Sequence, residues 1–203
     1  MYKIITDFLQ IIIPKSESDD FPTLIAFLSS IGHKPIIVSN KTRAKSLNKG
    51  AYLAKAKYLL FLHIDSELDH STIINLIQTL KKNDREALYY FSLKFDDGRI
   101  LRLNSLGANL RSRLFSLPYG DQGFCLSKEL FLRIGGFPEN VKYGEDLYFV
   151  LKTKRLGIPI INIPNYLITS SRKYLNNGWF ITTLLHQWRL ILILINFYFK
   201  KKL

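Results

Sequence analysis

The chain has 203 residues, of which 47% are hydrophobic and 22% charged. This balance is typical of a globular protein and excludes collagen-like and disordered chains. Lys and Arg number 29 against 16 Asp and Glu, so the formal net charge is +13. Such a charge predicts an anionic partner: a phosphorylated substrate, an acidic membrane face or nucleic acid. The single cysteine, Cys125, excludes an internal disulfide and fits a reducing compartment.

The first part of the chain alternates between strand and helix patterns. Strands are predicted over residues 8–13, 35–38 and 58–64, and helices over residues 21–28, 41–57 and 71–80, the last capped by Ser71. The strand at 58–64 is apolar on both faces, as in the centre of a parallel sheet. This alternation predicts βαβ units, and therefore a mostly parallel sheet covered by helices.

The second part continues with strands and helices and contains no low-complexity linker. Strands are predicted over residues 86–95, 123–126 and 160–163, and helices over residues 100–117 and 145–156. We therefore expect one α/β domain over residues 1–175, followed by an apolar helical appendage over residues 176–203.

The apolar stretch at residues 179–199 is interrupted by His186, Gln187, Arg189 and Asn196. Its longest clean run, residues 190–195, is far shorter than the about 18 residues that a spanning helix needs. Its aromatic residues and the lysines that follow it fit an interfacial helix. A terminal helix packed on its own domain explains the same pattern, and the two interpretations are compatible.

Three acidic segments are candidates for chemistry. Asp65 directly follows the central strand, where a carboxylate can hold a divalent cation, although such an Asp can also be a turn or a cap. Asp121 and Gln122 lie between glycines, in a segment that is either a ligand-binding loop or a tight turn. Glu145 and Asp146 open a helix, where they either complement its dipole or accept a proton from a hydroxyl.

Several basic residues accompany these acids along the chain. Most Lys and Arg side chains are solvated, but a few that converge on acidic loops would neutralise a diphosphate. The candidates are Arg43 on one predicted helix, Arg111 and Arg113 on another, and Arg172 near the end.

These segments, in this order, resemble the GT-A glycosyltransferases of family 2. The likeness is greatest to the bacterial subgroup of radical-SAM/selenodomain-associated transferases 2. It is carried by residues 43–51, 59–66, 106–123, 135–138, 144–147 and 169–174, which run through most of the chain. The resemblance implies a three-layer α/β/α, Rossmann-like nucleotide-diphospho-sugar transferase fold.

The resemblance also implies an inverting transfer of a sugar from a nucleotide-sugar donor to an acceptor hydroxyl. In that scheme Asp146, with Glu145, supplies the general base. Asp65 binds Mg²⁺ or Mn²⁺, and His63 takes the first acidic position of the usual Asp-x-Asp pair. The remaining implied roles fall into two groups: donor binding by Arg43, Asn48, Asp65, Asp121 and Gln122, and acceptor or phosphate binding by Arg111, Arg113 and Arg172.

The chain departs from the family where the nucleobase is expected to bind. Family members end the second strand in an Asp-Gly-Gly-Ser-like turn, whereas here Val38 runs into Ser39 and Asn40. The helix and strand expected before Arg43 are missing, so the nucleotide-binding half is shortened. A non-catalytic binding or scaffold protein is therefore the alternative to an active transferase.

A nucleic-acid binder is the third hypothesis and rests on charge alone. The expected setting is cytoplasmic, with peripheral contact to the inner face of a membrane through the C-terminal segment and an acceptor that is lipid-linked.

Overall fold

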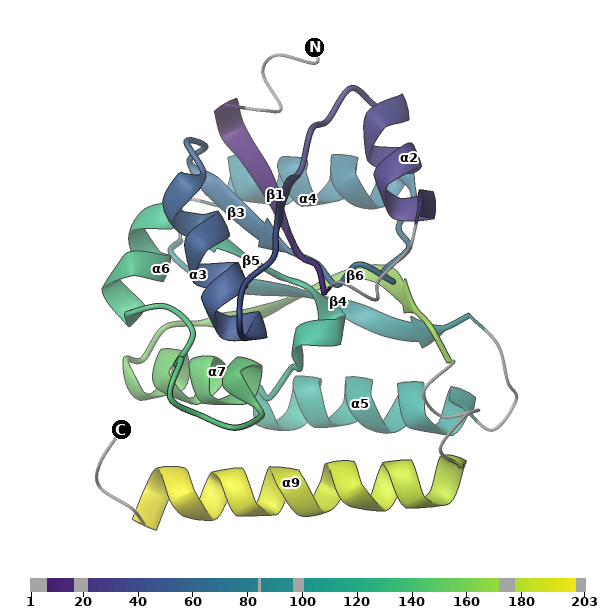
Figure 1. Ribbon diagram of the computed structural model, residues 1–203, viewed down its shortest axis with the longest axis vertical. Helices are drawn as coiled ribbons and strands as arrows, with labels where there is room; N and C mark the ends of the chain where they lie inside the picture. Colours follow the sequence, from purple (N-terminus) through teal and green to yellow (C-terminus); the bar gives the residue numbers. More distant parts are fainter. Residues whose placement is uncertain (1–6, 17–21, 84, 97–100, 172–177, 200–203) are drawn as a thin grey trace.

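A six-stranded sheet forms the centre of the molecule (Figure 1). The computed structural model describes residues 7–16, 22–83, 85–96, 101–171 and 178–199. The strands lie in the order β2-β1-β3-β5-β4-β6. Their bounds are β1 Leu9–Pro14, β2 Ile36–Val38, β3 Tyr58–Phe61, β4 Leu88–Phe95, β5 Phe124–Ser127 and β6 Ile160–Thr169. Only β5 runs against its neighbours, so the predicted α/β fold with a mostly parallel sheet is confirmed.

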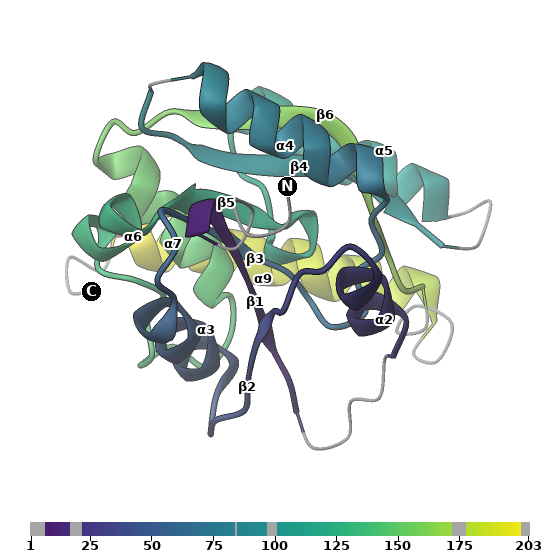
Figure 2. The same cartoon turned by 90° about the horizontal axis from the view of Figure 1, so that it is seen from above.

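Helices cover both faces of this sheet. The helices are α2 Pro22–Ser30, α3 Arg43–Leu53, α4 His70–Lys82, α5 Leu101–Phe115, α6 Lys128–Ile134, α7 Glu145–Arg155 and α9 Trp179–Phe199. Helices α2 and α4 close one apolar core, and α3, α6 and α7 close the other. From above, α2 and α4 lie toward the viewer and α9 lies beyond the sheet (Figure 2).

Local sequence signals explain where several helices begin. Helix α3 starts after Thr42, whose Oγ1 accepts from the backbone N–H of Lys45. Helix α4 is capped by Asp69 and not by the predicted Ser71, because the Asp69 carboxylate accepts from the backbone N–H of Thr72 at 2.7 Å. The Ser71 hydroxyl instead donates to that carboxylate. Both caps leave the first apolar residue of the helix facing the sheet.

The elements differ from the predicted ones mainly in length. Helix α3 ends at Leu53, β3 ends at Phe61, and β6 continues to Thr169 along the whole of β4. Helix α6 was not predicted, although Ser127 caps it and the left-handed Gly135 ends it. The edge strand β2 passes to α3 through residues 39–42 alone, without the helix and strand that the family resemblance implies before Arg43.

The reversed strand β5 lies between β3 and β4 and carries the cysteine. Cys125 is 1% exposed, and burial raises the pKa of its thiol. The thiol is therefore sealed inside the core that α2 and α4 close.

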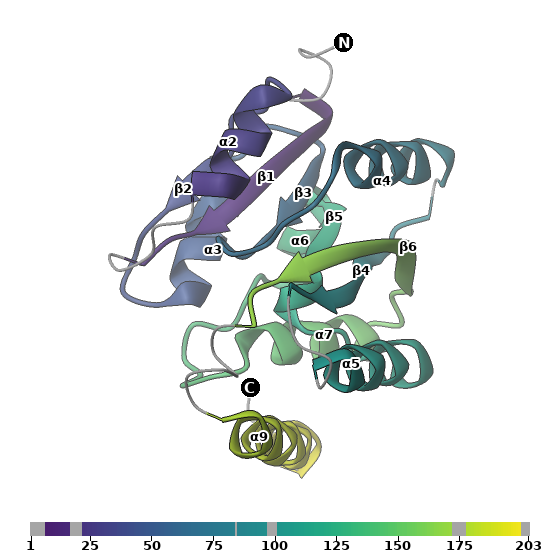
Figure 3. The ribbon, with the colours of Figure 1, turned by 90° about the vertical axis from the view of Figure 1, so that its right-hand side faces the viewer.

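Helix α9 packs on the outside of α7 and runs beside α5 (Figure 3). Ile193 is the anchor, 4% exposed and part of the core cluster around α7. By length and composition alone, the helix Phe180–Phe199 is apolar enough to cross a membrane, although its short uninterrupted apolar run predicted otherwise; 17% of its apolar window is buried in the protein. Most of the helix surface is therefore apolar and exposed.

Candidate active site

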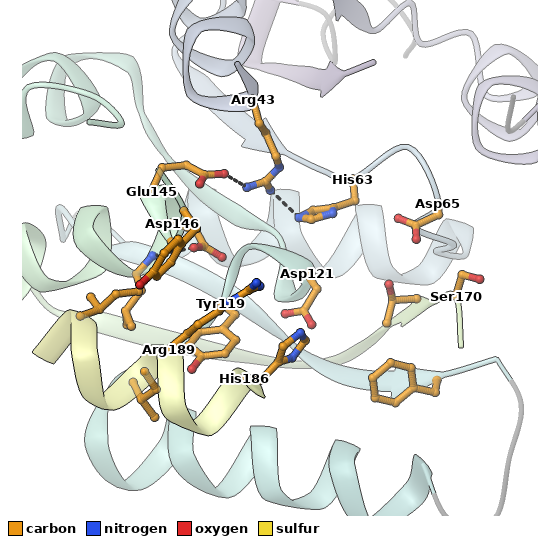
Figure 4. Close-up of a pocket in the computed structure, with 17 residues that line it drawn as sticks. Arg43, His63, Asp65, Tyr119, Asp121, Glu145, Asp146, Ser170, His186 and Arg189 are labelled. Carbon is orange, nitrogen blue, oxygen red and sulfur yellow. Dashed lines mark hydrogen bonds and ion pairs between the residues drawn. The ribbon is translucent and has the colours of Figure 1, made fainter. Parts of the chain in front are cut away.

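A cavity of about 330 Å³ opens at the edge of the sheet where the parallel strands end, beside α9 (Figure 4). This is the edge at which open α/β sheets bind ligands. The segment after β3 contributes His63 and Asp65, the short 3₁₀ turn η1 (Gly120–Gln122) contributes Asp121, and the start of α7 contributes Glu145 and Asp146. Three distant segments of the chain therefore bring acidic or imidazole groups to one cavity.

Arg43 lies at the start of α3 and reaches across this cavity (Figure 4). Its Nη1 pairs with Oε1 of Glu145 at 2.5 Å, and its Nη2 contacts Nε2 of His63. A Cβ on Gly120 would lie 2.8 Å from the same Nη2, so only glycine fits there without moving the guanidinium. The guanidinium is thus held between two elements as a fixed positive charge.

Asp146 is oriented by two backbone hydrogen bonds. Its Oδ2 accepts from the N–H of Gly120 at 2.7 Å, and its Oδ1 accepts from the N–H of Leu147 at 2.8 Å. Hydrogen bonds to both oxygens fix the direction of the carboxylate. The left-handed Gly144 (φ 75°) turns the chain into α7 just before it. Asp146 is therefore a preorganised carboxylate on the cavity wall.

Asp121 is the most perturbed acid of the site. Burial raises its pKa to about 6, and the nearby carboxylates of Asp146 and Asp65 act in the same direction. Arg111 and Arg43 oppose the rise. Within the part of the chain that the structure describes, its Oδ1 is buried and has no hydrogen-bond partner. A buried, unsatisfied acceptor aimed into a cavity is a group that a ligand donor can satisfy.

Two of the predicted donor-binding residues lie outside the cavity. Gln122 is fully buried: its Nε2 donates to the carbonyl of Phe91, and its Oε1 accepts from Ser112 and from the N–H of Tyr119. Asn48 bonds both backbone groups of Phe137 and holds the turn after α6 against α3. Both amides are committed to other protein groups, so they support the site from behind.

The predicted phosphate-binding arginines are also spread out. Arg111 stacks on Tyr119, with its Cζ 3.6 Å from the ring centroid, and donates through Nε to the carbonyl of Leu117. Arg113 is exposed on α5 and reaches Ser92. Arg172 lies outside the described residues. Of the two arginines that the structure describes, only Arg111 comes close to the site, where it also adjoins Asp121 in a smaller groove between α5 and α9.

A second cavity, of about 360 Å³, lies at the ends of β1 and β2. Lys15 and Lys41 line it, and it shares Arg43, His63 and Asp65 with the first cavity. The shortened turn after Val38 has therefore not removed the space next to the strand ends. The two cavities meet at the Arg43 guanidinium and the Asp65 carboxylate.

Sequence reasoning missed the contribution of α9 to the cavity. His186, Arg189, Leu190 and Ile193 of this helix line it, and the guanidinium of Arg189 lies over the ring of Tyr143, 5.3 Å from its centroid. A signal was present: His186 and Arg189 are three residues apart, which puts two polar side chains on one face of an otherwise apolar helix.

The metal prediction is matched only in part. Among the residues that the structure describes, no three His, Cys, Asp or Glu side chains lie close enough together to bind a metal ion. His63, at the expected first acidic position, contacts the Arg43 guanidinium. Asp65 supplies one hard oxygen donor, so a Mg²⁺ or Mn²⁺ ion would need the phosphates of a ligand to complete its coordination.

No family model and no curated protein matches the sequence. Solved structures do match in fold. Staphylococcus aureus TarS, residues 1–349, is 16% identical over 82% of this chain and 52% of its own, with a TM-score of 0.57. A TarS complex with UDP-GlcNAc aligns with a TM-score of 0.56 at 16% identity, over 82% of this chain and 50% of its own.

A third match is the mannosyltransferase PcManGT from Pyrobaculum calidifontis in complex with GDP-Man and Mn²⁺, at 14% identity, 79% and 56% coverage and a TM-score of 0.57. The chain spans about half the length of each of the chains in these three structures. The fold that they share with this chain is the GT-A fold of glycosyltransferases.

Proposed function

We propose that the chain is a glycosyltransferase that moves a sugar from a nucleotide-sugar donor to an acceptor hydroxyl. The observation that carries this proposal is the meeting of two cavities at Arg43, His63 and Asp65. A nucleotide in the cavity at the ends of β1 and β2 would direct its diphosphate to this junction. Its sugar would then enter the cavity that holds Asp146. Within this class, the sequence motifs favour family 2 and the radical-SAM-associated subgroup.

The diphosphate would be bound by charge. Arg43 is fixed by Glu145 and His63, and Lys15 and Lys41 line the path to it. A guanidinium can make two parallel hydrogen bonds to phosphate oxygens, which a lysine cannot. We therefore assign Arg43 to the donor diphosphate, and Glu145 to holding Arg43, in place of the base role implied by resemblance.

A divalent cation fits this scheme only if Asp65 and the donor phosphates bind it together. Asp65 would hold it together with the donor phosphates, and the ion would neutralise charge on the departing diphosphate. The expected observation is that Mn²⁺ alone leaves the melting temperature unchanged, while Mn²⁺ with a nucleoside diphosphate raises it above the value with nucleotide alone. An equal effect of Mn²⁺ without nucleotide would contradict shared binding.

Asp146 is the proposed general base. The acceptor oxygen attacks the anomeric carbon from the face opposite the diphosphate, and its proton passes to the Asp146 carboxylate. The bond between the anomeric carbon and the diphosphate oxygen breaks, and its electron pair leaves with the diphosphate. One displacement of this kind inverts the anomeric centre. General base catalysis contributes about 10²–10⁴-fold to the rate of such steps.

The non-catalytic scaffold is not favoured. Asp65, Asp121 and Asp146 converge on one open cavity. Bringing three carboxylates together lowers the stability of the fold, so a protein that needs only to fold would gain nothing from it. The cytoplasmic setting remains part of the proposal, and nucleic acid is not proposed as a partner.

A donor screen followed by a base variant tests the function. UDP and GDP are tried first, because solved proteins of this fold bind UDP-GlcNAc and GDP-Man; CDP and ADP follow. A bound nucleotide raises the melting temperature. Asp146→Asn is expected to keep that shift and lose about 10²-fold or more of transfer. Glu86→Gln, on an exposed ion pair, is the matched control. Failure of all four nucleotides at millimolar concentration would count against the proposal.

A further inference from the structure

Two helices next to the cavity leave unusually large apolar surfaces uncovered. Helices α5 and α9 run side by side (Figures 1 and 3), and Nδ2 of Asn104 donates to Oγ1 of Thr183 at 3.0 Å between them. Of the 21 large apolar side chains that the described part of the chain exposes, five lie on α5 and nine on α9. Exposed apolar side chains that gather in this way mark a binding surface, whereas scattered ones do not.

The exposed side chains of α5 follow the helix period. Leu103, Leu106, Leu110 and Leu114 recur every three or four residues and are 53–66% exposed. The opposite side of α5 packs through Leu101 against β4. Helix α5 thus turns its leucine stripe away from the domain, whereas an amphipathic surface helix normally turns such a stripe toward the core.

Helix α9 has a docked side and an uncovered side. Thr182 and Ile193 face the domain and are 4% exposed. The uncovered side presents nine large apolar residues, which are Phe180, Ile181, Leu184, Leu185, Trp188, Ile191, Ile195, Tyr198 and Phe199. A surface helix of a globular domain normally turns polar residues to water on this side.

Charge indicates what covers this surface. Neither α5 nor α9 contains an Asp or Glu, while Arg102, Arg113 and Arg189 are exposed on them. In the sequence, Lys200, Lys201 and Lys202 follow α9 directly. A second copy of the chain would bring the same positive charge, +13 in total, against this face. An anionic bilayer offers both an apolar interior and the opposite charge.

We propose that α5 and α9 together form a docking surface for an anionic lipid bilayer. Both helices lie in the membrane interface, with their apolar stripes among the acyl chains and the exposed Arg102 of α5 near the lipid phosphates. Because α9 is also a wall of the cavity, docking brings the cavity to the bilayer. If the proposed function holds, the acceptor hydroxyl then belongs to a molecule held in that bilayer.

Flotation with vesicles tests the surface on the full chain. The vesicles are phosphatidylcholine with or without phosphatidylglycerol, at low and at physiological salt. We expect binding to the anionic vesicles, weakened by salt and by omitting phosphatidylglycerol. The α5 pair Leu106→Gln with Leu110→Gln, and the α9 pair Leu184→Gln with Ile191→Gln, should each lower vesicle partitioning by at least about tenfold.

The control pair is Leu132→Gln with Leu156→Gln, which are equally exposed but lie elsewhere. It should bind like the unaltered protein, and so should Asp146→Asn, which separates docking from transfer. Wild-type binding by the α5 pair would overturn the proposal. Retention in the lipid fraction after alkaline carbonate would overturn it and indicate that α9 spans the membrane. A dimer that forms without lipid and that the α5 pair dissociates would overturn it and indicate that a second copy of the chain covers this surface.

Discussion

Arg43 and Glu145 are 102 positions apart in the sequence, yet Nη1 of one lies 2.5 Å from Oε1 of the other. The pair joins the first turn of α3 to the first turn of α7 across the cavity. It is partly shielded from water, with the two side chains 30% and 15% exposed. Each partner therefore holds the other in the place where a ligand must compete for it.

Arg43→Ala is expected to weaken nucleoside diphosphate binding, because it removes the fixed cation at the junction of the two cavities. The expected loss of affinity is about tenfold to a hundredfold, as for a charge-assisted hydrogen bond to phosphate. Arg43→Lys keeps the charge but should recover only part of the affinity. Titration calorimetry with the nucleotide found in the donor screen measures both.

A second ion pair supplies the control for Arg43. Arg133 and Glu86 also pair at 2.5 Å, but they are 51% and 47% exposed. Arg133→Ala should leave nucleotide affinity unchanged and hardly alter the free energy of unfolding, because exposed ion pairs contribute little to stability. Equal losses of affinity in Arg43→Ala and Arg133→Ala would mean that general charge, and not the site, binds the nucleotide.

Asp121 predicts an unusual dependence of stability on pH. Its pKa is about 6 in the folded protein, against an ordinary value of 3.8. Between these values the folded chain holds a proton that the unfolded chain has released, so the contribution of Asp121 to stability falls as pH rises through this window. Asp121→Asn removes the penalty and should be stabilised relative to the wild type at pH 7, by at most about 3 kcal/mol.

Urea unfolding at pH 4 and pH 7 measures this difference. Asp69 provides the opposite sign, because hydrogen bonds from Thr72 and Ser71 lower its pKa. Asp69 stabilises the fold above its ordinary pKa, and this stabilisation is lost as pH falls through the lowered value. Asp69→Asn should therefore be less stable than the wild type at pH 7, and this difference in the free energy of unfolding should disappear at low pH. If Asp121→Asn gains nothing between pH 4 and pH 7, the carboxyl is not buried as described.

Gln122 is expected to affect stability before it affects chemistry. Gln122→Ala leaves the carbonyl of Phe91 and the N–H of Tyr119 without their partner inside the protein. The expected cost is about 2 to 4 kcal/mol in the free energy of unfolding. Ser112→Ala, which removes one hydrogen bond of the same network, should cost less. A variant that loses donor binding at full stability would instead favour the ligand contact predicted from the sequence.

Gly144 controls how α9 sits against the domain. A Cβ at Gly144 would lie 2.3 Å from Cδ1 of Ile193, and the backbone there has φ 75°. Gly157 has a similar φ of 70°, but a Cβ there meets nothing within 4 Å. Gly144→Ala should therefore cost the backbone strain of about 1 kcal/mol and also displace α9, whereas Gly157→Ala should cost the strain alone.

Tryptophan fluorescence separates the two glycine variants, because both tryptophans of the chain, Trp179 and Trp188, belong to α9. Only Gly144→Ala should change the emission spectrum of the native state. Ile193→Ala in the Gly144→Ala background should restore part of it. Identical spectra for both glycine variants would mean that α9 tolerates the added methyl group.

The order of the elements could be predicted from the sequence, because local periodicity determines it. The strand at Tyr58–Phe61 and the stripe of α4 are examples. The reversal of β5, and its position between β3 and β4, could not be predicted, because strand pairing depends on residues far apart in the chain. Helix α6 was missed because its seven residues are too short for a clear period.

The candidate site was predictable only in part, for a related reason. Asp65 comes after a strand, and Asp146 lies in the first turn of a helix. The edge where parallel strands end brings such positions together. Gln122 has the same polar character, but its hydrogen bonds are satisfied inside the protein. The contribution of His186 and Arg189 depends on how α9 docks, and an apolar helix at the end of a domain gives little indication of its orientation.

The sealed position of Cys125 gives the protein a reporter of its own. The chain carries one cysteine, and its sulfur is covered on both sides by strands and above by helices. A thiol-specific reagent can reach it only when the centre of the sheet opens, so the rate of labelling in native buffer follows that opening. A nucleotide that stabilises the closed molecule should slow this reaction without any engineered probe.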